Sequence, residues 1–410
     1  MNKLLTVNET AEKLSVSSDT IRRWDKKGLI KAHRSELNYR LFDIDEVRRI
    51  HDKVGGVSSV SSYKILKERK MTPYTVVELF SGAGGTALGL ENAGIRDVML
   101  VEFDKNAAAT LRRNRPDWNI LEDDIHKVNF SNIKADIVEG GFPCQAFSYA
   151  GNKKGFGDTR GTLFYEFIRC VREIKPKIAV GENVRGLATH DEGRTLVTMT
   201  KELSEAGYNV AYKILRSQYL DVPQKRERLI IIGVRKDLNL PIFFPKERNY
   251  TISIREALKD CPRSEGQKYP KGKSEILKLV PPGGYWRDLP EKLQKQYMGA
   301  SFYMGGGKTG MARRLAWDEP CLTLTCSPAQ KQTERCHPEE TRPLNIREYA
   351  RIQTFPDDWE FVGSVAQQYK QIGNAVPVNL GYHIGKTLIA MLQNRYDEQT
   401  MERFKPLFFR

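Results

Sequence analysis

The chain has 410 residues, is 40% hydrophobic and carries a formal net charge of +15 at pH 7. This length allows about two or three domains with a sizeable core. The sequence contains no apolar run long enough to span a membrane, and polar residues follow Met1 too closely for a signal peptide. The six cysteines are scattered, which favours a reducing cytoplasm over a disulfide framework. Positive charge is concentrated in residues 1–70 and 236–345, which indicates two surfaces that face a polyanion.

The first residues of the chain have the pattern of a small helical domain. Thr6-Val7-Asn8-Glu9 is a capping box that begins a short helix. A second helix is expected over residues 20–27, with Ile21 and Trp24 one turn apart on its inner face. This second helix then presents three basic side chains outward, where a recognition helix would face a DNA groove. These are Arg22, Arg23 and Lys26.

After the second helix, residues 29–30 and 39–42 are expected to form a two-stranded wing around a polar turn. The whole segment resembles the winged helix-turn-helix of MerR-type regulators and excisionases, notably in Thr20-Ile21-Arg22-Arg23-Trp24. The resemblance implies that residues 1–54 bind DNA, and a domain used only for packing or dimerisation is the alternative. Residues 55–72, which begin with glycines and serines, are expected to be a linker.

A glycine-rich turn follows the first strand of the larger body. Residues 75–80 form an apolar, β-branched strand, and Ser81-Gly82-Ala83-Gly84-Gly85 turns it into a helix. Position 87 is alanine, so the third glycine of a dinucleotide-binding turn is missing and another nucleoside cofactor is expected. The cofactor contacts predicted at this turn are Phe80, Gly82, Gly84 and Gly85.

Acidic residues follow the next two predicted strands. Glu102 and Phe103 come after the strand at 97–101, where the carboxylate suits a ribose diol and the ring suits an adenine. Asp124 follows a third strand near residue 120 and suits the adenine amino group, with Ile125 beside it. Strands that alternate with helices at this spacing predict an α/β, Rossmann-like domain with a mostly parallel sheet and a site at the strand carboxyl ends.

Five ordered motifs then carry a resemblance to the bacterial C5-cytosine DNA methyltransferases of type II restriction–modification systems. The resemblance covers residues 73–235 and 342–390 and implies S-adenosyl-L-methionine as the cofactor. The motifs are Phe80-Ser81-Gly82-Ala83-Gly84-Gly85, Gly141-Phe142-Pro143-Cys144-Gln145, Glu182-Asn183-Val184, Gln224-Lys225-Arg226-Glu227-Arg228 and Gln371-Ile372-Gly373-Asn374-Ala375-Val376-Pro377.

The resemblance assigns a chemical role to each catalytic candidate. The thiolate of Cys144 would add to C6 of cytosine, which makes C5 nucleophilic enough to accept a methyl group. Glu182 would bond N3 and the exocyclic amine, Arg228 would bond the O2 carbonyl, and Arg226 would orient the site. The cytosine must leave the DNA stack for this chemistry, and residues 146–165 resemble the loop that closes over it. The sequence does not identify the base that removes the C5 proton.

The C-terminal part of the chain completes the predicted organisation. Residues 342–410 return to the catalytic domain, where Asn374 and Val376 are expected in the cofactor pocket. Ser217-Gln218-Tyr219-Leu220-Asp221 departs from the run that many family members carry. Residues 236–341 have the position and composition of the variable target-recognition domain, with Arg313 and Arg314 as candidate DNA contacts. The cysteines at 321, 326 and 336 fit no common zinc spacing, so no metal is expected.

The sequence therefore predicts a sequence-specific DNA (cytosine-5)-methyltransferase that acts on double-stranded DNA in the cytoplasm, without membrane association. A restriction endonuclease is its expected functional partner. The helix-turn-helix could repress the enzyme's own operon, or it could only raise the affinity for DNA. A tRNA cytosine methyltransferase of similar fold is the third alternative, which the long recognition region disfavours. Target sequence, preference for hemimethylated DNA and oligomeric state are not specified.

Overall fold

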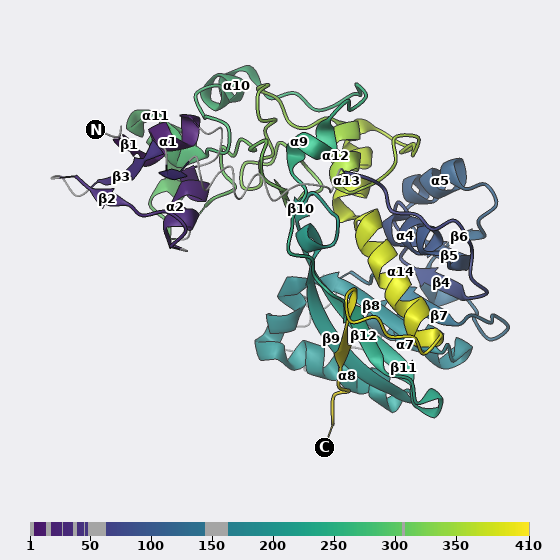
Figure 1. Cartoon of the computed structure of the whole chain (residues 1–410). Coiled ribbons are helices and arrows are strands. Elements are labelled where there is room, and N and C mark those ends of the chain that lie inside the picture. The colour runs from purple at the N-terminus through teal and green to yellow at the C-terminus, as the bar shows by residue number, and fades with distance from the viewer. Residues whose placement is uncertain are drawn as a thin grey trace. The chain divides into compact units, whose positions relative to one another are not determined.

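The structure is a computed structural model (Figure 1) that describes residues 4–13, 18–26, 28–35, 39–44, 46–47, 63–143, 163–305 and 308–409. The chain forms two compact units, each built from two stretches of sequence. The first unit combines Met1–Tyr63 with Tyr250–Ile352, and the second combines Lys64–Asn249 with Gln353–Arg410. The second unit contains the large sheet.

The second unit is built on a seven-stranded sheet with the order β6-β5-β4-β7-β8-β11-β9. The neighbours from β6 to β8 run parallel, whereas β11 is antiparallel to both β8 and β9. The predicted α/β fold with a mostly parallel sheet is thus confirmed. The strands are β4 (Thr75–Leu79), β5 (Arg96–Glu102), β6 (Ile120–Glu122), β7 (Ile137–Gly140), β8 (Ile178–Val184), β9 (Tyr208–Arg216) and β11 (Glu227–Arg235).

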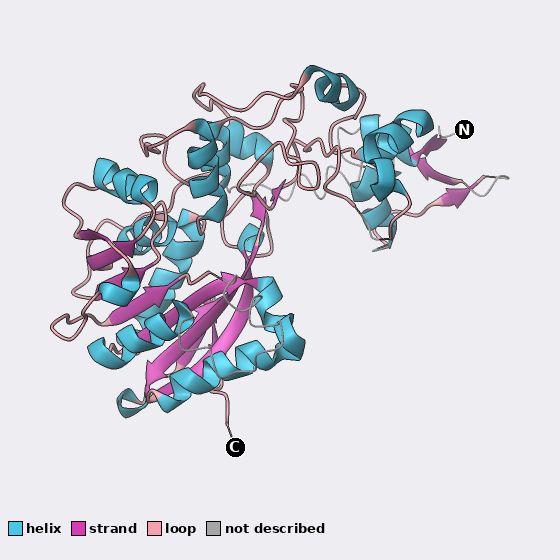
Figure 2. Ribbon diagram, turned by 180° about the vertical axis from the view of Figure 1, so that it is seen from behind, coloured by secondary structure: helices cyan, strands magenta, loops and turns pink. Residues whose placement is uncertain are grey.

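Helices cover both faces of this sheet (Figure 2). One core contains side chains of α4 (Gly85–Ala93) and α14 (Val378–Leu392), and the other contains side chains of α7 (Leu163–Ile174) and α8 (Arg194–Glu205). A Cβ at Gly89 would lie 2.7 Å from the Gly381 backbone, so glycine is what lets α4 and α14 pack this closely. The unit also contains α5 (Lys105–Asn114), α13 (Val365–Asn374), β10 (Gln224–Lys225) and the antiparallel pair β12 (Ile242–Pro245) and β14 (Met401–Phe404).

The N-terminal part of the first unit contains β1 (Leu4–Thr6), α1 (Val7–Lys13), α2 (Ser18–Lys26), β2 (His33–Arg34) and β3 (Arg40–Asp43). The Thr6 amide donates to Glu9 Oε2 at 2.8 Å and the Glu9 amide donates to Thr6 Oγ1 at 3.3 Å, so the capping box is confirmed. The wing differs from its prediction. Its first strand is β2 rather than residues 29–30, because Ile30 is buried in the core with Ile21, and β1 adds a third strand in the order β1-β3-β2.

The second stretch of the first unit (residues 250–352) overlaps the predicted target-recognition domain; this stretch, the recognition region, is irregular. It holds short helices separated by long loops, around a core that includes Trp286, Met298 and Cys336. The predicted loss of the strand–helix rhythm is therefore observed from residue 250, whereas residues 242–245 still form β12 of the second unit. The elements are α9 (Ile254–Leu258), α10 (Lys271–Leu277), α11 (Glu291–Met298), β13 (Cys321–Leu322) and α12 (Ile346–Ile352).

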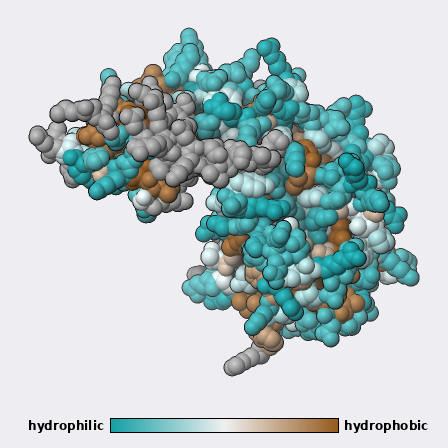
Figure 3. Space-filling model, in the orientation of Figure 1, coloured by the Kyte–Doolittle hydropathy of each residue, from teal (hydrophilic) through white to brown (hydrophobic). Residues whose placement is uncertain are grey.

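Among the described residues, no helix is long and apolar enough to cross a membrane. The face of the molecule seen in Figure 3 is mostly hydrophilic, with hydrophobic residues in small patches. Isolated exposed apolar residues are ordinary for a folded chain and need no special account.

Candidate active site

The predicted cofactor turn is shaped by its glycines. Phe80, directly after β4, has φ 60°, and Gly82 and Gly84 also have positive φ angles, of 54° and 84°. A Cβ at Gly85 would lie 2.0 Å from the carbonyl oxygen of Val376, so only glycine permits this approach. The structure thereby brings Val376 against the turn, although the two residues are almost three hundred positions apart in the sequence.

Glu102 holds the turn in place from the end of β5. Its Oε2 accepts the amide of Gly82 at 2.7 Å, and its Oε1 accepts the amide of Asp104 at 2.7 Å. Burial is the largest cause that raises the pKa of Glu102. The neighbouring Phe103 ring is 76% exposed, which leaves its face open to a ligand.

Asp124 and Ile125 follow β6 as predicted. Asp124 caps the turn Ile125–Lys127 by accepting the His126 amide at 3.1 Å, and it also pairs with the His126 ring at 2.6 Å. The hydrogen bond from the His126 side chain lowers the pKa of Asp124. Ile125 is buried beneath it, whereas Asn374 at the end of α13 is exposed.

These residues fit S-adenosylmethionine. A Cβ at Gly82 would meet no atom within 4 Å, so the turn has open space on that side. A carboxyl group, an exposed aromatic ring and a second carboxyl group follow successive strands at the edge where a doubly wound sheet binds nucleosides. The chemistry of this set matches a ribose, an adenine ring and an adenine amino group.

Two of the three predicted catalytic side chains that the structure describes are paired. Glu182 on β8 and Arg228 on β11 are joined by a bond of 2.7 Å between Oε1 and Nε, and their side chains are only 13% and 10% exposed. A Cβ at Gly141 would lie 3.2 Å from Glu182 Oε2, which places that oxygen beside the turn after β7. The pair is therefore held in a dry environment, where its interaction is stronger than in water.

The turn after β7 is fixed by Asn183, a residue for which the motifs predicted no role. The side-chain amide of Asn183 donates to the Phe142 carbonyl at 2.8 Å, and Phe142 is buried against Phe164 and Phe167. Asn183 lies between Glu182 and Val184 in the motif, and only this position in the motif could have indicated its role. Cys144 and residues 146–162 of the predicted loop lie outside the described residues.

Arg226 is 1% exposed and donates to the backbone carbonyls of Gly373 at 3.1 Å and Asn374 at 3.3 Å. It thus fastens the end of α13, where the predicted cofactor contact Asn374 lies. Gln353, for which the motifs predicted no role, adds to this link. It accepts the Gln224 amide at 2.8 Å and donates to the Ile372 carbonyl at 2.7 Å.

The recognition region corrects one prediction. Arg314 is only 3% exposed, and its guanidinium donates to several backbone carbonyls, including those of Val280 and Leu277 at 2.7 Å. Arg313 is also buried, with its guanidinium 5.8 Å from the centre of the Tyr285 ring. Arg314 holds the loops of this region together, so its prediction as a DNA contact is wrong for this structure. The same prediction for Arg313 stays a prediction.

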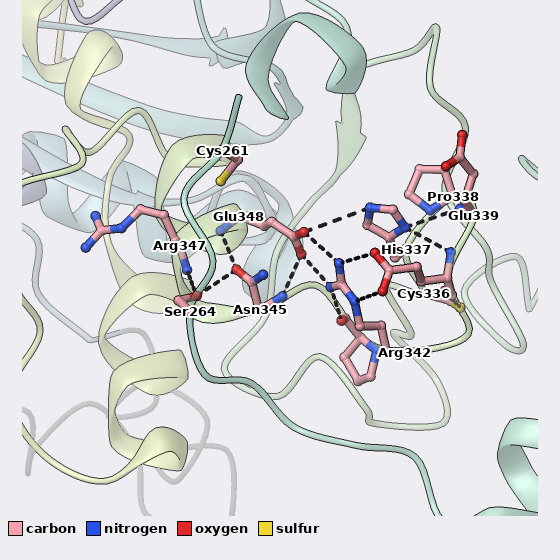
Figure 4. A network of polar contacts seen from close by, with 12 residues as sticks. Cys261, Ser264, Cys336, His337, Pro338, Glu339, Arg342, Asn345, Arg347 and Glu348 are labelled. Carbon is pink, nitrogen blue, oxygen red and sulfur yellow. Dashed lines mark hydrogen bonds and ion pairs between the residues drawn. The ribbon is translucent and has the colours of Figure 1, made fainter. Parts of the chain in front are cut away.

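A second polar network fixes the end of the recognition region (Figure 4). Arg342 bonds Glu348 at 2.7 Å and Glu340 at 2.9 Å, and Glu348 accepts the Asn345 amide at 2.7 Å. The ring nitrogen Nδ1 of His337 accepts the amides of Glu339 and Glu340. Burial lowers the pKa of His337, which favours the neutral ring. This network is structural.

In the N-terminal domain, Arg22 and Lys26 are exposed on α2, in agreement with their expected position, whereas the side chain of Arg23 lies outside the described part. Thr20, at the start of the same helix, is buried and bonds the Glu319 side chain of the recognition region. The helix-turn-helix therefore contacts the recognition region within the first unit.

Comparison with known proteins decides the family. Residues 74–390 match the family model described as C-5 cytosine-specific DNA methylase. The chain belongs to this family. Residues 6–42 match a second model, the MerR family regulatory protein. The type II methyltransferase M.Eco47II of Escherichia coli is 54% identical over 402 residues, which cover 94% of this chain and 95% of that one. M.Sau96I of Staphylococcus aureus is 56% identical over 79% of this chain and 77% of its own.

Solved structures show the same fold. A methyltransferase encoded within an E. coli prophage has a TM-score of 0.58 at 25% identity, and covers 78% of this chain and 99% of its own. A Spodoptera frugiperda DNMT2 structure has a TM-score of 0.53 at 19% identity, with 77% and 99% covered. The protein is a DNA (cytosine-5)-methyltransferase of the type II restriction–modification class, and its methyl donor is S-adenosylmethionine.

Proposed function

We propose that the enzyme methylates a cytosine that has been flipped out of duplex DNA, through a covalent bond between Cys144 and C6. The observation that carries this proposal is the Glu182–Arg228 pair beside Gly141, three residues before Cys144. A buried carboxyl and guanidinium at that place suit N3, the exocyclic amine and O2 of a cytosine ring. A base within stacked DNA could not reach them.

Each predicted catalytic residue has a separate role in this reaction. The Cys144 thiolate adds to C6, while Glu182 bonds N3 and the amine and Arg228 stabilises the charge that develops at O2. Bound S-adenosylmethionine supplies an electrophilic methyl group to C5. Phe80, Gly82, Gly84, Gly85, Glu102, Phe103, Asp124, Ile125, Asn374 and Val376 would hold that cofactor. Removal of the C5 proton then expels the Cys144 thiolate and restores the aromatic ring.

Duplex DNA that contains 5-fluorocytosine tests the covalent step. Fluorine replaces the C5 proton and cannot be removed by a base, so a cysteine adduct accumulates and survives denaturing electrophoresis. We expect the wild-type enzyme to form this adduct when S-adenosylmethionine is present, and Cys144→Ser to form none. An equal amount of denaturation-resistant complex with the serine variant would exclude Cys144 as the nucleophile.

The MerR-like segment favours a second function, repression of the operon that encodes the methyltransferase and a partner restriction endonuclease. Arg22 and Lys26 are exposed on α2, the helix that enters a DNA groove in helix-turn-helix proteins. The full chain should protect a discrete site upstream of its own gene from nuclease cleavage. Arg22→Ala with Lys26→Ala should abolish that footprint and leave methylation active. Uniform, salt-sensitive protection without a discrete site would instead indicate a general DNA-affinity role.

A further inference from the structure

A row of ionisable side chains crosses one face of the central sheet, close to the carboxyl ends of its strands. Side chains alternate along a strand, so Glu78 on β4 and Glu139 on β7 share a face with Val76 and Ile137, which pack in the core formed with α4 and α14. On β8, the residue opposite Glu139 is Val180, and Glu182 lies two residues further on the same face. The row therefore ends at the Glu182–Arg228 pair.

Glu78 and Glu139 face each other directly in this row. They are register partners on adjacent parallel strands, and they are only 1% and 3% exposed. Neither forms an ion pair with any residue that the structure describes. The backbone amide of Ala87, in the first turn of α4, favours the charged form of Glu78 and so lowers its pKa against the other causes. One oxygen of Glu78, Oε2, is buried and has no hydrogen-bond partner within the described part of the chain.

The charged groups around this pair are mainly acidic. Glu182 lies beyond Glu139, and Asp97 and Glu102 approach from β5. The one acidic group of α4, Glu91, is paired with Arg115, and His383 on α14 is bonded to Asp221. Arg228 forms an ion pair with Glu182. Burial, followed by repulsion from neighbouring carboxylates, raises the pKa of both Glu78 and Glu139 well above the usual range.

We propose that Glu139 retains a proton at neutral pH and donates it to Glu78 Oε2, so that a hydrogen-bonded acid pair joins β4 to β7. One proton satisfies the buried oxygen and removes the repulsion between two facing carboxylates. The pair joins the strand that leads into the cofactor turn to the strand that leads into the Cys144 turn. Glu139 is therefore a positioning residue for methyl transfer, a role that rests on the Cys144 mechanism proposed above.

Two substitutions separate this role from a need for negative charge. Glu139→Gln keeps a neutral donor of the same shape, and Glu139→Leu removes the donor. We expect kcat/KM of the wild type to fall at alkaline pH as the shared proton is lost. The glutamine variant should keep most of its activity at neutral pH and lack this alkaline fall. The leucine variant should lose about tenfold or more at neutral pH, because it leaves Glu78 Oε2 without a donor.

Asp97→Asn is the matched control, since Asp97 is another buried carboxyl without a hydrogen-bond partner among the described residues, yet it does not face β7. It should retain the alkaline fall. Infrared difference spectra of the wild type against Glu139→Gln, recorded without DNA, should show one protonated carboxyl at neutral pH. This infrared result does not depend on the Cys144 mechanism. An unchanged alkaline fall in Glu139→Gln, or no protonated carboxyl in the difference spectrum, would overturn the proposal.

Discussion

At the scale of single residues, the chemistry of the site depends on a buried pair. Glu182 and Arg228 come from strands that are antiparallel neighbours, so the sheet itself fixes their approach. The motifs alone indicated that these two residues would lie close together, because each motif lies at the end of a strand. What the motifs could not supply was the register that makes the two side chains diagonal neighbours.

Replacing Glu182 by glutamine should separate catalysis from folding. The amide keeps the shape but cannot transfer a proton to N3, so we expect kcat to fall by about 10²- to 10⁴-fold, the usual contribution of such a group. Binding of S-adenosylhomocysteine, measured by calorimetry, should be unchanged. Glu202→Gln is the control, because Glu202 on α8 also pairs with an arginine, Arg172, away from the site. Comparable loss in the control would refute a specific role for Glu182.

Arg314 shows where reasoning from the sequence fails. A basic pair in a loop-rich region is typical of a DNA surface, and nothing local distinguishes it from a structural pair. Only the folded loops bring the Val280, Leu277 and His337 carbonyls around the Arg314 guanidinium. Burial decides the outcome here, and it cannot be deduced from charge.

Arg314→Met should therefore destabilise the protein rather than change its contacts with DNA. The substitution keeps much of the side-chain volume but leaves several buried carbonyls without a donor. We expect a loss of about 3 kcal/mol or more in the free energy of unfolding. Thermal denaturation measures this, with Lys292→Met, an exposed lysine on α11, as the control. If Arg314→Met kept full stability and lost DNA affinity, the original prediction of a DNA contact would be restored.

At the scale of elements, the parallel strands were predictable because each is a short apolar run that ends in a polar or glycine-rich turn. The residues after β4, β5 and β6 fell at one edge of the sheet as expected. The first strand of the wing was not predictable in the same way. Residues 29–30 have β-forming side chains, but Ile30 is taken into the helical core, so pairing begins later at β2.

The start of α4 offers a test of packing. Gly85→Ala introduces a methyl group where only 2.0 Å separates the ideal Cβ from the Val376 carbonyl oxygen. We expect a loss of about 1–3 kcal/mol of stability, the usual cost of overpacking. Cofactor affinity should also fall, since the turn must shift. Gly272→Ala on α10 is the control, because no atom lies within 4 Å of its Cβ. Unchanged cofactor affinity in Gly85→Ala would contradict the close approach.

At the scale of the whole molecule, buried acidic groups should give stability an unusual dependence on pH. Burial raises the pKa of Glu78, Asp97 and Glu139 in the folded protein. A raised carboxyl pKa stabilises the fold fully below the unfolded value, which is near 4, and this stabilisation is lost as pH rises through the folded value. Each group contributes a slope of about 1.4 kcal/mol per pH unit within that window.

Thermal denaturation from weakly acidic to alkaline pH should therefore show a falling midpoint, and Asp97→Asn should reduce the slope because it removes one of the three groups. Acidic groups with a lowered pKa, such as Asp104 beside Lys370, act in the opposite direction at low pH. A midpoint that does not change between neutral and alkaline pH in the wild type would show that these carboxyls are ionised in the folded state.

The most direct test of DNA cytosine methylation through Cys144 is methyl transfer from labelled S-adenosylmethionine to genomic DNA, followed by bisulfite sequencing. The wild type and Cys144→Ser are compared. We predict 5-methylcytosine at one short sequence motif with the wild type, and none with a folded variant that still binds the cofactor. A mark that persists in Cys144→Ser would contradict the covalent mechanism. No DNA mark from active, cofactor-binding wild-type protein would contradict the assignment of DNA as the substrate.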